Sequence, residues 1–227
     1  MHVDVVFTPD ETVAATRLAI VVDVLRATST IAQALAAGYE RVLCAGEIDD
    51  ARRLRAATPD SLVGGEREAR RIEGFDVGAS PREFQEPRAR TLILSTTNGT
   101  RAILAAAAHA DEVVLGSLLN LAAVARHAAG RGGDVAVVCA GFKGAFALDD
   151  AYCAGRIVQL LEGRPTDAAV AAARLAASFP TALDGLKART YGPPGLEADI
   201  AFCARESVLD VVPRLSGSVD GAAEIVA

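Results

Sequence analysis

The chain has 227 residues, of which 51% are hydrophobic and only 4% aromatic, and its formal net charge at neutral pH is −6. A chain of this length can bury a substantial core. Its acidic balance argues against sequence-independent binding of nucleic acid, which needs a basic surface to neutralise phosphates. The four cysteines form no C-x-x-C pair, so neither a zinc ribbon nor a thioredoxin-type site is indicated. A small molecule is the partner that this composition favours.

Targeting and membrane signals are absent from the sequence pattern. The first residues lack a basic region followed by the apolar stretch of roughly 7–15 residues that a signal peptide needs. No apolar run approaches the ~20 residues required to cross a bilayer. We therefore expect a cytoplasmic protein that works without a membrane. Small α/β enzymes are often dimers, and the Ala-rich helix faces of this chain would permit a homodimer.

Short β-branched runs alternate with Ala- and Leu-rich segments of helical period, which is typical of βαβ units in a mostly parallel or mixed sheet. Strands are predicted at 2–7, 18–24, 41–45, 61–65, 91–96, 112–116 and 134–140. Helices are predicted between them at 29–37, 47–57, 99–108 and 118–129. Residues 66–90 have no clear periodicity, and loops longer than ~12–15 residues in compact domains are commonly functional. We expect this segment to fold over the site.

The pattern changes in the last third of the chain, where helical periods dominate. Helices are predicted at 147–163, 166–178, 181–190 and 196–206, and only 211–216 resembles a strand. The sequence thus predicts one α/β domain over residues 1–227 with three-layer α/β/α architecture. Its sheet-rich part would be 1–146, and its C-terminal third, 147–227, would be a helical cover.

Several hydrophobic runs end in a polar cluster that is suited to hold an anion or a metal. Asp23–Thr30 follows one such run and Thr96–Arg101 follows another, while Gly64–Arg67 and Cys139–Gly144 take equivalent positions. If the runs are parallel strands, all four clusters lie along one edge of one sheet. Open α/β folds bind their ligands at such an edge. The recurrence predicts a site for phosphate or carboxylate.

Asp23 ends an apolar run, and Arg26 follows it by three residues. Thr28 and Ser29 then supply hydroxyls at a predicted helix N-terminus, where an anion would meet main-chain N–H groups and the positive end of the helix dipole. A carboxylate beside an anion usually needs a cation between them, and Mg²⁺ prefers oxygen ligands and bridges to phosphate. The alternative is that Asp23 only caps the helix.

The second candidate anion site is the stretch that begins at Thr96. Its candidate phosphate-binding residues are Thr97, Asn98, Gly99, Thr100 and Arg101. A capping turn would account for the threonines, the asparagine and the glycine. Arg101 favours the anion site, because capping does not need it and an arginine can clamp a phosphate through two hydrogen bonds.

Acidic residues recur at one more predicted strand end and at one predicted helix start. Glu66 and Arg67 repeat the pairing of an acid with a guanidinium, although such neighbours are often a surface ion pair. Asp149 and Asp150 start a predicted helix, where the dipole alone favours acids. They are also candidate metal ligands, because the glycine turn around Lys143 brings them to the same edge. Adjacent carboxylates point in different directions on a helix, so we expect one of the two to face the site.

Six segments, in this order, resemble the 2-phosphosulfolactate phosphatase family. They are Val22–Ile31, Gly64–Arg67, Phe75–Pro81, Thr96–Ala102, Gly116–Asn120 and Cys139–Gly141. The resemblance extends from about residue 3 to Ala204. It implies an α/β/α fold and a Mg²⁺-dependent phosphatase that hydrolyses (2R)-phospho-3-sulfolactate to 3-sulfolactate and inorganic phosphate.

The implied substrate is a small polyanionic phosphate ester that carries phosphate, carboxylate and sulfonate groups. The opposing charge would come from Arg26, Arg67, Arg101 and Lys143. Metal ligands would be Asp23 and Glu66 with Asp149 or Asp150, while Thr28, Thr97, Asn98 and Gly99 would hold the phosphate. Asp23 could also act as the nucleophile. Three other functions are compatible with the residues: a non-catalytic binder, a phosphatase for another small phosphorylated hydroxy acid, and a phosphotransferase.

Overall fold

The computed structural model describes residues 1–10, 14–67, 70–96, 98–192 and 194–227. The strands are β1 (His2–Val6), β2 (Thr16–Val22), β3 (Arg41–Ala45), β4 (Ser61–Arg67), β5 (Arg70–Arg71), β6 (Thr91–Ser95), β7 (Ala110–Gly116), β8 (Val135–Cys139), β9 (Arg164–Pro165), β10 (Arg214–Val219) and β11 (Ala222–Val226). The helices are α1 (Ala27–Ala37), α2 (Ile48–Ala57), α3 (Gly99–Ala107), α4 (Leu121–Arg131), α5 (Leu148–Leu160), α6 (Asp167–Ala177), α7 (Ala182–Lys187) and α8 (Glu197–Cys203), with the 3₁₀ turn η1 at Pro81–Phe84. The strands and helices predicted before residue 147 are therefore confirmed, with ends that differ by a few residues.

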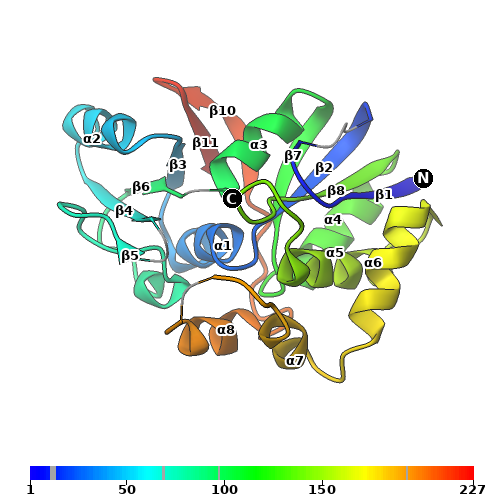
Figure 1. The fold of residues 1–227 in the computed structure, drawn as a ribbon. Helices are drawn as coiled ribbons and strands as arrows, with labels where there is room; N and C mark the ends of the chain where they lie inside the picture. Colours follow the sequence, from blue (N-terminus) through cyan, green and yellow to red (C-terminus); the bar gives the residue numbers. More distant parts are fainter. Residues whose placement is uncertain (11–13, 68–69, 97, 193) are drawn as a thin grey trace.

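The sheet consists of two groups of parallel strands joined by an antiparallel hairpin. Its order is β5-β4-β6-β3-β11-β10-β7-β2-β8-β1-β9. β10 and β11 pair antiparallel with each other, with β7 and with β3. Figure 1 shows this hairpin between β3 and β7. Because the direction reverses at each of these pairings, β3, β6 and β4 run opposite to β7, β2 and β8. The polar clusters therefore do not share one edge of a single parallel sheet, as the sequence suggested.

The two faces of the sheet are covered by different helices, as the side-chain alternation of a strand requires. In β2, Leu18 and Ile20 pack with residues of α4, α5 and α6, whereas Ala19 and Val21 pack with residues of α1 and α3. In the other strand group, Leu43 of β3 faces α2. Helices on both faces confirm the α/β fold. The described ranges include no helix that is long and apolar enough to cross a bilayer.

Helices α1 and α3 bring the two strand groups together. A Cβ atom on Gly99 would lie 2.6 Å from Cβ of Ala27 and 3.1 Å from Oδ2 of Asp23, so the N-termini of the two helices are in direct contact. α1 follows β2 and α3 follows β6, and these strands run in opposite directions. Residues of both strand groups pack with α1 and α3 in one core cluster, and α1 lies near the centre of the view in Figure 1.

The C-terminal third is helical only as far as Cys203. The strand predicted at 211–216 is β10, and β11 is an additional strand, so the helical cover ends before the hairpin. Ala, Ser and Gly are frequent in 214–226 and give a weak strand signal. Asp220 and Gly221 form the turn with φ angles of 48° and 84°. Asp-Gly is a strong hairpin signal, and it was present in the sequence.

The described residues of the segment 66–90, which are 66–67 and 70–90, have more regular structure than their lack of periodicity suggests. The segment contains β5 and η1, and the main-chain N–H of Asp76 donates to the carbonyl oxygen of Val63 at 3.0 Å. It thus folds back along β4, and Ala79 lies in the wall of the cavity described below.

Candidate active site

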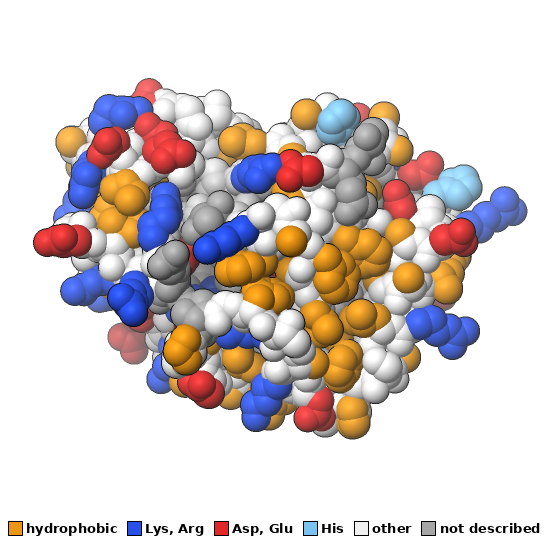
Figure 2. Space-filling model, viewed as in Figure 1, with side chains coloured by type: hydrophobic (Ala, Val, Ile, Leu, Met, Phe, Trp, Pro, Cys, Tyr) orange, Lys and Arg blue, Asp and Glu red, His pale blue; other side chains and the backbone are white. Residues whose placement is uncertain are grey.

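A cavity of about 510 Å³ lies where the N-termini of α1 and α3 meet. Among the described residues that line it, two are acidic and four are basic. The acids are Asp23 and Glu66, and the bases are Arg26, Arg67, Lys143 and Arg189. Basic side chains (blue) lie on both sides of the hollow between the left and right parts of the face in Figure 2. This excess of positive charge suits an anionic ligand, although the whole chain is acidic.

Asp23 is placed by the tight connection between β2 and α1. Its Oδ1 accepts a hydrogen bond from the main-chain N–H of Ala27 at 3.2 Å. The Thr28 hydroxyl donates to the carbonyl oxygen of Asp23 at 2.9 Å and lies 3.2 Å from its main-chain nitrogen. Asp23 therefore contacts the helix N-terminus and lines the cavity at the same time, while Thr28 fixes its main chain.

The carboxyl group of Asp23 is in an environment that opposes its ionisation. Burial, together with the charges of Asp149 and Glu66, raises its pKa to about 7 against the lowering effect of the Ala27 hydrogen bond and of Arg26. Carboxylates that repel one another in a buried site are stabilised when a cation binds between them. The electrostatics of this cluster therefore favour a bound cation.

Glu66 and Arg67 lie at the end of β4 and both line the cavity. The Arg67 guanidinium donates to the carbonyl oxygen of Glu66 at 2.8 Å and to the hydroxyl of Ser95 at 3.1 Å. Ser95 ends β6, so the guanidinium forms hydrogen bonds with two neighbouring strands, β4 and β6. The two residues predicted as a pair thus both line the cavity.

Asn98 and Lys143 connect the start of α3 to the loop after β8. Oδ1 of Asn98 lies 3.4 Å from the main-chain nitrogen of Lys143, which donates to it. Lys143 has a φ angle of 52°, and its Nζ lies 5.5 Å from the ring centroid of Phe142. All three residues line the cavity.

Described residues between 189 and 196 form a wall of the cavity that the sequence did not reveal. Arg189, Tyr191 and Leu196 line the cavity, and the Tyr191 ring stacks on Phe142 with centroids 4.6 Å apart. The Tyr191 hydroxyl donates to Oδ1 of Asp149. The helix predicted at 181–190 ends at Lys187, so Arg189 lies beyond it. A signal was present, since an aromatic residue precedes a Gly/Pro-rich turn.

Several predicted phosphate-binding residues do not line the cavity. The Ser29 hydroxyl donates to the carbonyl oxygen of Val24 at 2.8 Å, and the Thr100 hydroxyl lies 3.5 Å from that of Ala45. Arg101 is 57% exposed and forms an ion pair with Asp10. Gly99 and Thr28 are not among the lining residues either. Thr97 lies outside the described residues.

Asp149 and Asp150 are buried behind the cavity wall. Both carboxylate oxygens of Asp150 accept main-chain hydrogen bonds, from Val24 at 2.9 Å and from Gly141 at 3.0 Å. Burial and the charges of Asp149 and Asp23 raise the pKa of Asp150 well above its usual range. Asp150 thus connects the ends of β2 and β8. Neither aspartate lines the cavity, so the structure brings only Asp23 and Glu66 of the four predicted metal ligands to it.

The acids at the cavity fit a metal site in which the substrate supplies some of the ligands. In the part of the chain that the structure describes, no cluster of three or more acidic, histidine or cysteine side chains forms a ready metal site. Mg²⁺ commonly binds through one or two carboxylates, waters and substrate phosphates. Asp23, Glu66 and the amide oxygen of Asn98 are therefore a donor set of the kind that Mg²⁺ accepts, although they are insufficient for a closed protein site.

Comparisons with known proteins find relatives over nearly the whole chain. A family model described as 2-phosphosulpholactate phosphatase matches residues 6–218. A protein of Carboxydothermus hydrogenoformans named "Probable 2-phosphosulfolactate phosphatase" is 38% identical over 224 residues, which cover 94% of this chain and 93% of that protein. Proteins with the same name in Thermotoga maritima and Thermus thermophilus are 37% and 38% identical, and each alignment covers 96% of this chain. These alignments also cover 96% and 95% of the two relatives. The match spans both strand groups and the cavity between them, and this chain belongs to the 2-phosphosulpholactate phosphatase family.

Proposed function

We propose that this protein is a Mg²⁺-dependent phosphatase that hydrolyses (2R)-phospho-3-sulfolactate to 3-sulfolactate and inorganic phosphate. The observation that carries the proposal is a cavity with two carboxylates and four basic side chains, in a chain whose relatives are named for this activity. A substrate with phosphate, carboxylate and sulfonate groups brings several negative charges into one small volume. Four basic side chains match that demand.

Asp23 and Glu66 would hold the metal ion, with Asn98 as a neutral oxygen donor. Mg²⁺ bound there would neutralise charge on the phosphoryl oxygens and orient the group for displacement. The repulsion that raises the pKa of Asp23 would then be replaced by attraction to the cation. The buried position of Asp23 after β2 makes this donor rigid.

The basic residues divide into two sets by their neighbours. Arg26 follows Asp23 in the β2–α1 connection and Arg67 follows Glu66 at the end of β4, so both are suited to bind the phosphoryl oxygens. Lys143 and Arg189 flank the Phe142–Tyr191 ring pair on the loops after β8 and α7. We assign these two residues to the carboxylate and sulfonate end of the substrate.

The direct test is phosphate release by the purified chain from (2R)-phospho-3-sulfolactate and from a panel of phosphorylated two- and three-carbon acids, with Mg²⁺ and with EDTA. The proposal expects fastest release from phosphosulfolactate and loss of release in EDTA. If phosphate were released only from another phosphorylated acid of the panel, that acid would replace phosphosulfolactate as the proposed substrate. Tight binding of these esters with no release would identify a binder, and transfer of label to an acceptor other than water would identify a phosphotransferase.

Replacing Arg189 by glutamine should affect one end of the substrate. Hydrogen bonds between charged groups contribute roughly 1.5–3 kcal/mol, so we expect KM for phosphosulfolactate to rise about 10- to 100-fold with a smaller change in kcat. Kinetics with ethyl phosphate, which lacks both the carboxylate and the sulfonate, should change much less. Arg126→Gln is the matched control, because Arg126 is exposed on α4 and pairs with Asp210. Equal losses with both substrates would contradict the assignment.

A further inference from the structure

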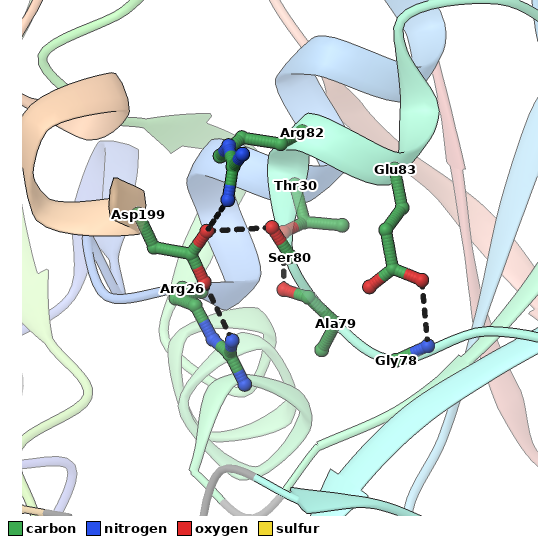
Figure 3. Close-up of polar contacts among 8 residues, drawn as sticks. All are labelled: Arg26, Thr30, Gly78, Ala79, Ser80, Arg82, Glu83 and Asp199. Atoms are coloured by element: carbon green, nitrogen blue, oxygen red, sulfur yellow. Dashed lines mark hydrogen bonds and ion pairs between the residues drawn. The ribbon is translucent and has the colours of Figure 1, made fainter. Parts of the chain in front are cut away.

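Asp199, on the short helix α8, lies behind the cavity and contacts one of its basic residues. Its Oδ2 lies 2.7 Å from Nη1 of Arg26, and its Oδ1 accepts a hydrogen bond from the Ser80 hydroxyl at 2.6 Å. Nη1 of Arg82 is 3.9 Å from the same Oδ1. Figure 3 shows the carboxylate between the three partners. Three segments distant in sequence therefore meet at one carboxylate.

Burial distinguishes the Arg26–Asp199 pair from the surface ion pairs of this protein. The two side chains are only 8% and 7% exposed. Removing two charges from water is costly, and apolar residues of similar size would often serve stability equally well. A contribution to folding is therefore a weak explanation for the pair. Arg26 also lines the cavity, which gives the pair a second role.

Arg26 is held at its main chain and at its guanidinium. Its main chain occupies the N-cap position of α1, where its carbonyl oxygen accepts a hydrogen bond from the N–H of Thr30 at 2.9 Å. Its guanidinium is planar, so the hydrogen bond to Asp199 restricts how the remaining N–H groups are oriented. A long side chain fixed in this way loses little conformational entropy when it binds an anion.

The segment that carries Ser80 is itself held against α1. The Thr30 hydroxyl donates to the carbonyl oxygen of Ala79 at 2.8 Å, and the Glu83 carboxylate accepts from the main-chain N–H of Gly78 at 3.2 Å. Both contacts are visible in Figure 3. Ser80 is thus a fixed donor to Asp199, and Asp199 is a fixed acceptor for Arg26.

We propose that Asp199 is a positioning residue, which orients the Arg26 guanidinium toward the phosphoryl group of the substrate and is itself oriented by Ser80. The inference rests on the proposed function, because it assigns Arg26 to the phosphate. Helix α8 and residues 78–83 would then help to form the phosphate-binding end of the cavity. Asp199 acts through Arg26 and does not touch the substrate.

The test is a double-mutant cycle between Asp199→Asn and Arg26→Gln. Loss of such a supporting partner typically costs 10- to 100-fold in activity or affinity, so we expect Asp199→Asn to lower kcat/KM by roughly 30-fold. In the Arg26→Gln background the same change should cost less than about twofold, because the residue to be positioned is already absent. Losses that multiply, or an Asp199→Asn variant as active as the wild type, would overturn the inference.

Two further variants separate positioning from damage to the fold. Arg82→Gln removes the exposed and more distant partner of Asp199, so its kcat/KM should stay within about twofold of the wild type. Ser80→Ala keeps the Arg26–Asp199 pair but removes the second hydrogen bond, and should cost a smaller factor of about three to ten. If Asp199→Asn does not fold, the cycle is repeated with Ser80→Ala in its place, in the wild type and in Arg26→Gln. An equal loss in both backgrounds would then overturn the inference.

Binding of inorganic phosphate, measured by calorimetry, provides a readout that needs no turnover. When it is introduced into the wild-type chain, Asp199→Asn should weaken phosphate binding about tenfold. When it is introduced into the Arg26→Gln variant, it should leave phosphate binding unchanged. If the wild type binds phosphate but hydrolyses no ester, the proposed function fails while this cycle still tests the inference. If Asp199→Asn binds phosphate as tightly as the wild type, the inference fails regardless of activity. If the wild type does not bind phosphate, the inference is also overturned.

Discussion

Replacing Asp23 by asparagine is expected to lower kcat by about a thousand-fold, because loss of the metal-binding carboxylate removes roughly 4 kcal/mol of charge stabilisation in the transition state. The change keeps the size of the side chain and its contact with Ala27 at the start of α1. Steady-state phosphate release at saturating Mg²⁺ measures the effect. Asp111→Asn, an exposed acid that pairs with Arg17, is the control and should remain fully active. Substantial activity in Asp23→Asn would exclude Asp23 as a metal ligand and as a nucleophile.

The same substitution should stabilise the metal-free protein. The pKa of Asp23 is raised from 3.8 to about 7 in the fold, so between these pH values the folded state binds the proton more tightly than the unfolded chain does. Stability therefore falls as the pH rises from about 4 to about 7, and the cost persists above pH 7. Because asparagine carries no charge, the free energy of unfolding of the metal-free Asp23→Asn variant should exceed that of the wild type by about 4 kcal/mol at pH 8.

Thermal unfolding in EDTA at pH 8 and pH 6 measures this second effect. The wild type should unfold at a higher temperature at pH 6 than at pH 8, and Asp23→Asn should show a smaller difference between the two. A variant that is less stable than the wild type at pH 8 would contradict the expected repulsion. The combination of lost activity and gained stability is the signature of a site whose charges are arranged for a ligand.

Gly155→Ala should have the largest effect on stability. A Cβ atom there would lie 2.1 Å from the carbonyl oxygen of Ala172 and 2.8 Å from Cβ of Ala176, so α5 and α6 would have to separate. Because the nearest atom belongs to the main chain, it cannot move aside as a flexible side chain would. We expect a loss of about 3 kcal/mol in the free energy of unfolding, measured by urea denaturation.

Gly130→Ala is the matched control. Gly130 lies near the end of α4, and a Cβ atom there would meet nothing within 4 Å. Alanine should stabilise this helix by about 0.5–1 kcal/mol, because it restricts the unfolded chain more than glycine does. Equal stability of the two variants would show that α5 and α6 can separate without cost.

The sequence predicted the elements well because each apolar run is bounded by a polar cluster. That rule located Asp23, Glu66 and Asn98 at strand ends, and all three line the cavity. Strand order and direction are not encoded in such local patterns. The sequence therefore gave no indication that the clusters after β2 and β6 meet from oppositely directed strands.

Hydroxyl and guanidinium groups were the least predictable part of the site. Near a helix start, Thr28 and Ser29 can satisfy main-chain groups, and they do so here. Arg101 lies on the exposed side of α3 and pairs with Asp10. Arg189 and Asp199 follow no strand, and only tertiary structure brings them to the cavity and to Arg26.

The β10–β11 hairpin has a consequence for the order in which this protein can be built. The residues that line the cavity all precede residue 197, yet the two strand groups that hold them become one sheet only when β11 pairs Ala223 with Cys44 of β3. During synthesis the chain therefore carries all of these lining side chains before the strand pairing that joins the two groups can form. Contacts between residues so far apart in sequence are slow to form. Ligand binding should consequently be the last property acquired as the chain emerges from the ribosome, after the helices around each strand group have folded.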